Sequence, residues 1–150
     1  MKHTDYDLLC RELAALTAGV PYETANLANA AALLWQQLHG INWAGFYKMT
    51  DGALVLGPFQ GKPACIRISV GKGVCGTAVA RDETQVVADV HQFPGHIACD
   101  CASNSEIVVP IHVDGQVWGV LDIDSPHFAR FTEEDRTGLE HFVAILETVL

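Results

Sequence analysis

The chain has 150 residues, of which 49% are hydrophobic and 18% are charged. This composition is typical of one folded domain with a sizeable core, and it excludes a disordered chain. The net charge of −9 differs from that of most nucleic-acid binders, which carry a basic patch, so no nucleic-acid partner is expected. No apolar run approaches the ~20 residues that cross a bilayer, and the N-terminus shows no signal-peptide pattern. We therefore expect a cytoplasmic protein without membrane contact.

Two helices are predicted before the first strand. The leucines of residues 5–18 recur at helical spacing, and Gly19 can end that helix. Pro21 suits the first turn of a second helix, which we expect to end at Gly40. The first apolar stripe consists of Leu9, Leu13 and Leu16, and the second of Leu27, Ala31, Leu34, Trp35 and Leu38.

The hydrophobic period changes to two after residue 40, which predicts strands. A turn at Asp51-Gly52 joins the first two strands, a loop follows at 57–61, and a short helix is expected over 74–81. Residues 89–104 show no period, and so long an irregular segment in a compact domain is usually functional or disordered. The expected strands of this part are 42–49, 53–56, 65–70 and 85–88.

The C-terminal third predicts a hairpin followed by a helix. Residues 106–112 and 116–124 flank a turn at Asp114-Gly115. Thr132 with Asp135 is a good helix N-cap. The stripe of this helix is Leu139, Phe142, Val143, Leu146 and Leu150. Helices thus bracket hairpin-connected strands, which indicates one α+β domain over 1–150, with an antiparallel sheet and helices on one face.

The first strand suggests a binding surface. Trp43, Gly45 and Tyr47 share one face, whereas Ala44 and Phe46 point to the other. A glycine between two aromatic residues leaves an apolar slot beside the polar N–H and O–H groups of Trp43 and Tyr47, as in many small-molecule sites. Two ordinary core aromatics would give the same pattern, so both interpretations stay open on these residues alone.

The last hairpin carries three acids, Glu106, Asp122 and Asp124. Asp122 and Asp124 lie two residues apart on an apolar strand, and such carboxylates are expensive to bury unless paired or protonated. The alternative is a strand end at which both reach water, and it fits Asp124 better because Ser125-Pro126 follows.

The register of the hairpin decides whether Glu106 joins the two aspartates. A two-residue loop pairs Ile107 with Asp122 and turns Glu106 away, whereas a three-residue loop pairs Glu106 with Asp122. We adopt the second register because it collects the apolar side chains on one face, although Pro110 could shift the pairing through a bulge. These side chains are Ile107, Val109, Ile111, Val117, Leu121 and Ile123.

Five cysteines are many for a chain without a leader pattern, and an odd number does not suit a structural disulfide framework. In a reducing cytosol, cysteines are more often catalytic, redox-active or metal-bound, although each one alone could be a buried small hydrophobe. We assign Cys10 to the core. Cys75 lies where a helix begins, a position that lowers a thiol pKa. Cys65 falls on a predicted strand, and Cys99 and Cys101 fall in the irregular segment.

Several motifs resemble those of the free methionine-(R)-sulfoxide reductases, which are enzymes built on the GAF fold. The resemblance runs from about residue 22 to about residue 146, in the same order and with compatible spacing. It implies a GAF-like domain with a ligand pocket on the sheet face opposite the helices. The motifs cover residues 42–47, 56–65, 73–78, 89–91, 94–100, 105–108 and 119–125.

The resemblance also implies roles for the cysteines. Cys99 matches the nucleophile, Cys65 the resolving partner, and Cys75 a thiol with an alternative or structural role. Cys101 stands where a small residue is expected, so which thiol first meets oxidised Cys99 is open. The family's pocket residues fall on Trp43, Tyr47, Glu106, Asp122 and Asp124.

The implied reaction reduces free L-methionine (R)-S-oxide. The Cys99 thiolate attacks sulfur and becomes a sulfenic acid, Cys65 forms a disulfide with it, and thioredoxin restores both thiols. We assign Glu106 and Asp124 to the sulfoxide oxygen and Asp122 to the ammonium group. Trp43 and Tyr47 would contact the methyl end. We expect a homodimer and neither a cofactor nor a metal.

Three other interpretations were weighed. Cys99, Cys101, His91 and His96 could bind a metal, but their spacing is not the paired pattern of structural zinc sites. Residues 71–76 fit G-x-G-x-x-G, but hairpins flank them where a dinucleotide site has a βαβ unit. A GAF sensor would have little use for Cys65 and Cys99, and the chain shows no output domain.

Overall fold

The structure is a computed structural model that describes residues 3–95 and 102–150. In chain order its elements are α1 (Tyr6–Thr17), α2 (Glu23–Gln37), β1 (Trp43–Thr50), β2 (Ala53–Gly61), β3 (Arg67–Ser69), α3 (Gly73–Arg81), β4 (Gln85–Val87), the 3₁₀ helix η1 (Val90–Gln92), β5 (Ser105–Val113), β6 (Gln116–Ser125) and α4 (Glu133–Glu147). No helix in the described ranges is both long enough and apolar enough to span a bilayer.

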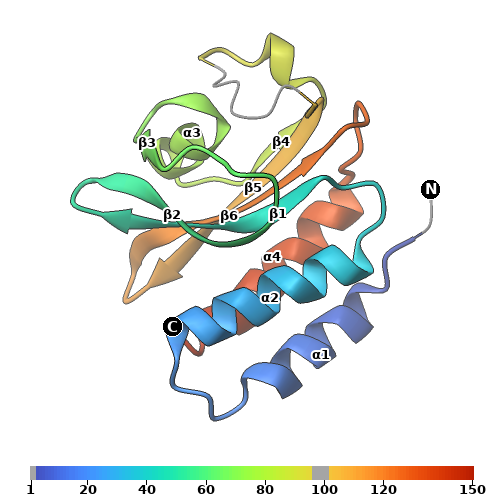
Figure 1. The fold of residues 1–150 in the computed structure, drawn as a ribbon, viewed down its shortest axis with the longest axis vertical. Coiled ribbons are helices and arrows are strands. Elements are labelled where there is room, and N and C mark those ends of the chain that lie inside the picture. Colours follow the sequence, from blue (N-terminus) through green and yellow to red (C-terminus); the bar gives the residue numbers. More distant parts are fainter. Residues whose placement is uncertain (1–2, 96–101) are drawn as a thin grey trace.

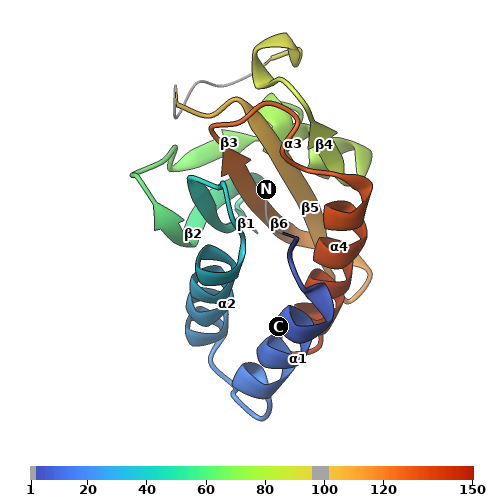
Figure 2. The ribbon, with the colours of Figure 1, turned by 90° about the vertical axis from the view of Figure 1, so that its right-hand side faces the viewer.

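The strands form one antiparallel sheet in the order β3-β2-β1-β6-β5-β4. Helices α2 and α4 cover one face of the sheet, and α1 packs on those two helices (Figures 1 and 2). The expected α+β fold is therefore confirmed. Helix α3 departs from the expectation of helices on one face only, because it packs on the opposite face of the sheet, where it contacts β3, β4, β5 and β6.

The sheet separates two hydrophobic cores. Ala44 and Phe46 point into the core beneath α2 and α4, whereas Trp43 and Tyr47 point into the core beneath α3. This confirms the two-residue alternation predicted for the first strand. Each face of β1 is therefore covered, and a pocket can form only where the α3 layer leaves space.

The N-terminal helices are close to their predictions. Helix α2 ends at Gln37 and not at Gly40, because Leu38 already has an extended backbone. Two residues of the predicted stripes face solvent: Leu16 is 46% exposed and Trp35 is 40% exposed.

The predicted Thr132 cap of helix α4 is confirmed, and it forms a full capping box with Asp135.

Strand β2 is longer than predicted, since residues 57–61 are part of it and not a loop. The β1–β2 register shifts between Gly45 and Tyr47, which face Phe59 and Leu56 respectively. Gly57 and Pro58 of β2 thus stand opposite a single residue of β1, which makes a β-bulge. A bulge accommodates proline within a strand, which is why the Gly-Pro pair does not end β2. Strand β3 is shorter than predicted and leaves Cys65 before its start.

The register adopted for the last hairpin was wrong in detail. Asp114 and Gly115 have φ of 53° and 77°, and they form the two-residue turn that pairs Val113 with Gln116. A bulge between Ile111 and His112 then adds one residue on β6, so that Glu106 faces Asp124.

By itself the two-residue turn would place Glu106 on the sheet face opposite to Asp122. The extra residue in the bulge returns Glu106 to the same face. Glu106 therefore still shares a face with Asp122, as predicted, although Asp122 faces Val108. Val117 lies on the turn side of the bulge and does not join the buried apolar face, whereas the other five residues assigned to that face do.

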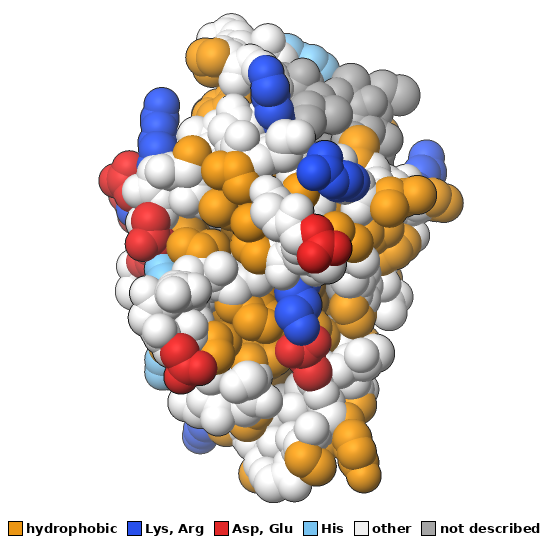
Figure 3. All heavy atoms as spheres, turned by 90° about the vertical axis from the view of Figure 1, so that its left-hand side faces the viewer, with side chains coloured by type: hydrophobic (Ala, Val, Ile, Leu, Met, Phe, Trp, Pro, Cys, Tyr) orange, Lys and Arg blue, Asp and Glu red, His pale blue; other side chains and the backbone are white. Residues whose placement is uncertain are grey.

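The sheet edge formed by β2 and β3 carries mixed charges. On this side of the molecule, Lys and Arg side chains lie separately among acidic and hydrophobic ones (Figure 3). Ile66 and Val70, which flank β3, are 74% and 42% exposed.

Candidate functional site

A pocket lies between the sheet and α3. It brings together the five side chains predicted to bind substrate, Trp43, Tyr47, Glu106, Asp122 and Asp124, and adds Cys75. The remainder of the described lining is Pro63, Ala64, Ile68, Lys72, Gly73, Val74 and Ser103. The pocket thus has an aromatic side, an acidic side, and the first turn of α3 above them.

The aromatic wall is a stack of three rings. The centroid of Trp43 lies 5.9 Å from that of Tyr47 and 5.1 Å from that of Phe59, with interplanar angles of 25° and 15°. The indole Nε1 of Trp43 donates to the carbonyl of Lys62 over 3.0 Å, which fixes the ring. A Cβ on Gly45 would lie 2.2 Å from the Cβ of Phe59, so the stack requires glycine here. Sequence reasoning missed Phe59 because it assigned that residue to a loop.

Tyr47 connects this wall to the segment that carries Cys65. Its hydroxyl donates to the Cys65 carbonyl over 2.9 Å. Burial, and then the charge of Asp122, raise the pKa of Tyr47, which keeps the phenol protonated. Cys65 is disulfide-bonded. The cysteines considered as its reaction partners, Cys99 and Cys101, lie outside the described residues.

The acidic wall comes from the two central strands of the pocket. Glu106 on β5 is 8% exposed and Asp122 on β6 is 6% exposed. Burial, followed by the charges of Asp122 and Asp124, raises the pKa of Glu106 well above that of an ordinary glutamate. Burial also raises the pKa of Asp122, although hydrogen bonds from Glu106 and Cys75 oppose that rise. Of the two, Asp122 is the one held as an acceptor, and Glu106 is the one held protonated.

Asp122 also has an oxygen without a partner. Its Oδ1 is buried and forms no hydrogen bond to any described residue. An unpaired buried oxygen of this kind costs free energy, which a cation or a hydrogen-bond donor in the pocket would recover.

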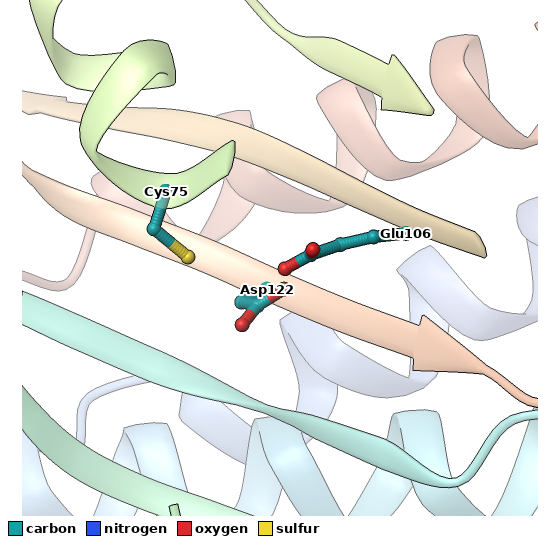
Figure 4. Close-up of side chains that lie close together, drawn as sticks. All are labelled: Cys75, Glu106 and Asp122. Carbon is teal, nitrogen blue, oxygen red and sulfur yellow. The ribbon is translucent and has the colours of Figure 1, made fainter. Parts of the chain in front are cut away.

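Cys75 does not have the lowered pKa that its place at the start of α3 suggested. Burial raises the pKa of its thiol well above the usual value, and the charges of Asp122 and Glu106 add to the effect. The helix N-terminus would lower the pKa of Cys75, but this effect is weaker than that of burial and of the nearby carboxylates, which disfavour another negative charge. Figure 4 shows the Cys75 side chain on α3 converging with Glu106 and Asp122, and one ligand atom from each lies within 4.8 Å of the others.

Lys72 is a further lining residue that sequence reasoning missed. It is the N-cap residue of α3 and contributes the one basic side chain among the described lining residues. The signal available in the sequence was its position immediately before Gly73, in the turn that begins the helix.

The alternative four-ligand metal site lies mostly outside the described residues, which do not include Cys99, Cys101 or His96. The remaining candidate, His91, has its Nε2 3.0 Å from Oδ1 of Asn104.

The fold and the position of this pocket define a GAF-domain protein, and the GAF domain model matches residues 10–150. The free methionine-R-sulfoxide reductase of Escherichia coli (strain K12) is 61% identical over 145 residues, which cover 97% of this chain and 88% of that one. The chain belongs to the GAF-domain family of free methionine-R-sulfoxide reductases.

Two solved structures extend this comparison. The fRMsr of Staphylococcus aureus in complex with substrate has a TM-score of 0.96 and 53% identity, covering 100% of this chain and 98% of that one. The free methionine-R-sulfoxide reductase of Neisseria meningitidis in complex with its substrate has a TM-score of 0.94 and 44% identity, covering 99% and 92%. The fold that holds the pocket is therefore shared with two substrate-bound structures.

Proposed function

We propose that this chain reduces free L-methionine (R)-S-oxide to L-methionine, with Cys99 as the nucleophile and Cys65 as the resolving thiol. The observation that carries the proposal is the group of buried Glu106, buried Asp122 and half-buried Asp124, which lines one pocket with stacked aromatic rings. The names of the relatives, which are reductases of this substrate, support the same reaction.

The first step transfers oxygen from the substrate to the enzyme. The thiolate of Cys99 bonds to the sulfur of the protonated sulfoxide; oxygen then moves to the Cys99 sulfur as the sulfur–oxygen bond of the substrate and the transient sulfur–sulfur bond both break. The products are methionine and a Cys99 sulfenic acid, so the substrate is reduced by two electrons and the thiol is oxidised by two. Sulfur becomes electrophilic only when its oxygen is protonated, and this step therefore needs an acid.

Glu106 is suited to supply that proton. Its raised pKa favours the protonated form up to a higher pH than in an ordinary glutamate, so it can hydrogen-bond to the sulfoxide oxygen and donate to it. Asp124, directly opposite on β6, would share the contact with that oxygen. Asp122 has a buried oxygen without a partner, which suits the ammonium group of a free amino acid.

The aromatic wall would hold the other end of the substrate. Trp43 and Tyr47 present apolar ring surface to the pocket, and this surface suits the methyl group and the side-chain carbons. An ammonium group bound at Asp122 is absent from a methionine within a peptide. The pocket would therefore favour the free amino acid over peptide-bound methionine sulfoxide.

The second half of the cycle restores the enzyme. The thiol of Cys65 attacks the Cys99 sulfenic acid, which forms a disulfide and releases water. Thioredoxin, a dithiol, then reduces this disulfide by exchange and becomes oxidised itself. Cys75 would have a structural role, because burial holds it as a neutral thiol, and the neutral form is a poor nucleophile.

Turnover of matched substrates tests the proposal. The R and S diastereomers of free methionine sulfoxide, and an R sulfoxide blocked at both termini, are supplied with thioredoxin, its reductase and NADPH. We expect rapid consumption of the free R form and negligible turnover of the other two. Activity on the S form or on the blocked peptide alone would overturn the substrate assignment.

A further inference from the structure

Three potential metal ligands meet in the pocket from three separate elements. Cys75 comes from the first turn of α3, Glu106 from β5 and Asp122 from β6, and all three residues are buried. The Cys75 sulfur and one carboxylate oxygen from each acid lie within 4.8 Å of one another. Figure 4 shows the three side chains pointing toward a common point.

Asp122, one of the three residues, also has an oxygen without a partner among the described residues. Asp122 is 6% exposed, and its Oδ1 is buried without a hydrogen-bond partner in the described chain. In the proposed reaction this carboxylate receives the substrate ammonium group. A metal cation could satisfy the same buried oxygen.

The chemistry of the three groups agrees with this. All three are buried, where a thiolate or carboxylate is stable only with a compensating charge. A divalent cation supplies that charge, because it favours the thiolate and both carboxylates over their protonated forms. Any proton that a ligand still carries would pass to solvent on binding, and no electron transfer is involved.

We propose that Cys75, Glu106 and Asp122 bind one divalent cation of the Zn²⁺ and Cd²⁺ class, and that this ion excludes the substrate. Zinc–ligand distances of about 2.3 Å to sulfur and about 2.0 Å to oxygen place tetrahedral ligands about 3.5 Å apart. The three side chains would therefore close by about 1 Å, and water would occupy the fourth position, which faces the pocket.

The thiolate of Cys75 determines which metal ions the site would prefer. Sulfur ligands favour zinc and cadmium, whereas Mg²⁺ and Ca²⁺ require oxygen ligands in larger number. The ion is an inhibitor and not a cofactor, because it occupies the two acids that the proposed reaction assigns to the substrate. Only the exclusion of substrate depends on the proposed function; binding of the ion depends on the geometry alone.

The binding test uses a background from which three other cysteines have been removed. Cd²⁺ is titrated into the variant Cys65→Ser/Cys99→Ser/Cys101→Ser, and the ultraviolet charge-transfer band between thiolate and cadmium is recorded. Cys75→Ala is then added to this background, with Cys10→Ala as the matched control, since Cys10 is the other buried free thiol among the described cysteines. Circular dichroism and thermal unfolding establish that each variant is folded.

We expect one equivalent of Cd²⁺ and a single-thiolate band in the background variant. Cys75→Ala should abolish the band and weaken binding by more than the about 10–100-fold caused by loss of an outer-shell partner. Cys10→Ala should retain both, Glu106→Gln should weaken binding, and Mg²⁺ should not compete. A band that is absent from the folded background variant, or that disappears with Cys10→Ala and not with Cys75→Ala, would overturn the site.

A competition step separates this proposal from the proposed function. The background variant lacks the nucleophile, so free methionine (R)-S-oxide can bind without being consumed. We expect the sulfoxide to displace Cd²⁺ and reduce the band. A sulfoxide that binds without displacing the ion would overturn both the exclusion of substrate and the role of Asp122, while the band itself would still establish the ion site.

Discussion

Glu106 and Asp124 face each other directly across the β5–β6 ladder, and both side chains line the pocket. Like charges in directly opposite positions destabilise a sheet. Because Glu106 is also buried, its pKa is raised well above the ordinary value, so the proton is held on Glu106. The sheet thus keeps an acid in its neutral form, and this condition affects both stability and turnover.

The raised pKa of Glu106 predicts how stability changes with pH. The unfolded chain loses the Glu106 proton near the ordinary value of about 4.3, whereas the folded chain retains it to higher pH. In that interval the folded state binds more protons, so stability falls as pH rises from about 4 toward the folded-state pKa. Glu106→Gln removes this loss. We expect urea unfolding to show the variant gaining stability over the wild type as pH rises from about 4 to about 8.

The control for this measurement is Glu83→Gln, since Glu83 is exposed. Its stability difference from the wild type should not change with pH in the same manner. A Glu106→Gln difference that is constant over the whole range would mean that Glu106 titrates normally in the folded protein.

The same residue predicts a change in turnover. If protonated Glu106 donates to the sulfoxide oxygen, kcat should fall as pH rises through its raised pKa. Glu106→Gln should lower kcat by about 10²-fold or more and remove this basic limb of the profile. The measurement is kcat against pH with saturating substrate and reductant. A variant that retains the wild-type kcat and basic limb would show that another group supplies the proton.

Much of this site could be predicted from the sequence because it depends on strand parity. The two-residue alternation of β1 placed Trp43 and Tyr47 together, and it was confirmed. The shared face of Glu106 and Asp122 was also predicted, although for an incomplete reason. A wider loop and a two-residue turn followed by a bulge give the same parity, and the sequence does not distinguish them.

Other features depend on contacts between distant segments. The bulge at Gly57-Pro58 that extends β2 arises from pairing with β1, so a Gly-Pro pair looked like a loop. The raised pKa of Cys75 arises from burial and then from acids more than 30 residues further along the chain, and local helix position reveals neither. Phe59 and Lys72 were missed because only the fold brings Phe59 against Trp43 and Lys72 into the pocket lining.

A matched pair of glycine variants tests the aromatic wall. In Gly45→Ala the new Cβ would meet the Cβ of Phe59 at 2.2 Å, so we expect the ring stack to shift and the KM to rise. In Gly115→Ala nothing lies within 4 Å, but φ of 77° is strained for alanine, at a turn remote from the pocket. The control should lose about 1 kcal/mol of stability and keep its KM. Equal KM values in both variants would contradict the role of the stack.

A buried ion pair outside the pocket offers a test of the fold alone. Asp135 accepts the Tyr6 hydroxyl over 2.6 Å and contacts Arg130 Nη1 at 3.1 Å, and it thereby ties α1 to the start of α4. Asp135→Ala leaves Arg130 buried without its partner, at a cost of about 3–5 kcal/mol, whereas Tyr6→Phe should cost about 1 kcal/mol. Urea unfolding measures both. If Asp135→Ala cost no more than Tyr6→Phe, the ion pair would not be a stabilising element.

The central claim, that Cys99 attacks and Cys65 resolves, is tested most directly by a single turnover without reductant. Reduced protein is mixed with excess free methionine (R)-S-oxide, and methionine formed per chain is measured together with the oxidation state of each cysteine by mass spectrometry. We predict one methionine and one Cys65–Cys99 disulfide in the wild type, no methionine in Cys99→Ser, and one methionine with a trapped Cys99 sulfenic acid in Cys65→Ser. A full equivalent of methionine from folded Cys99→Ser would contradict the account.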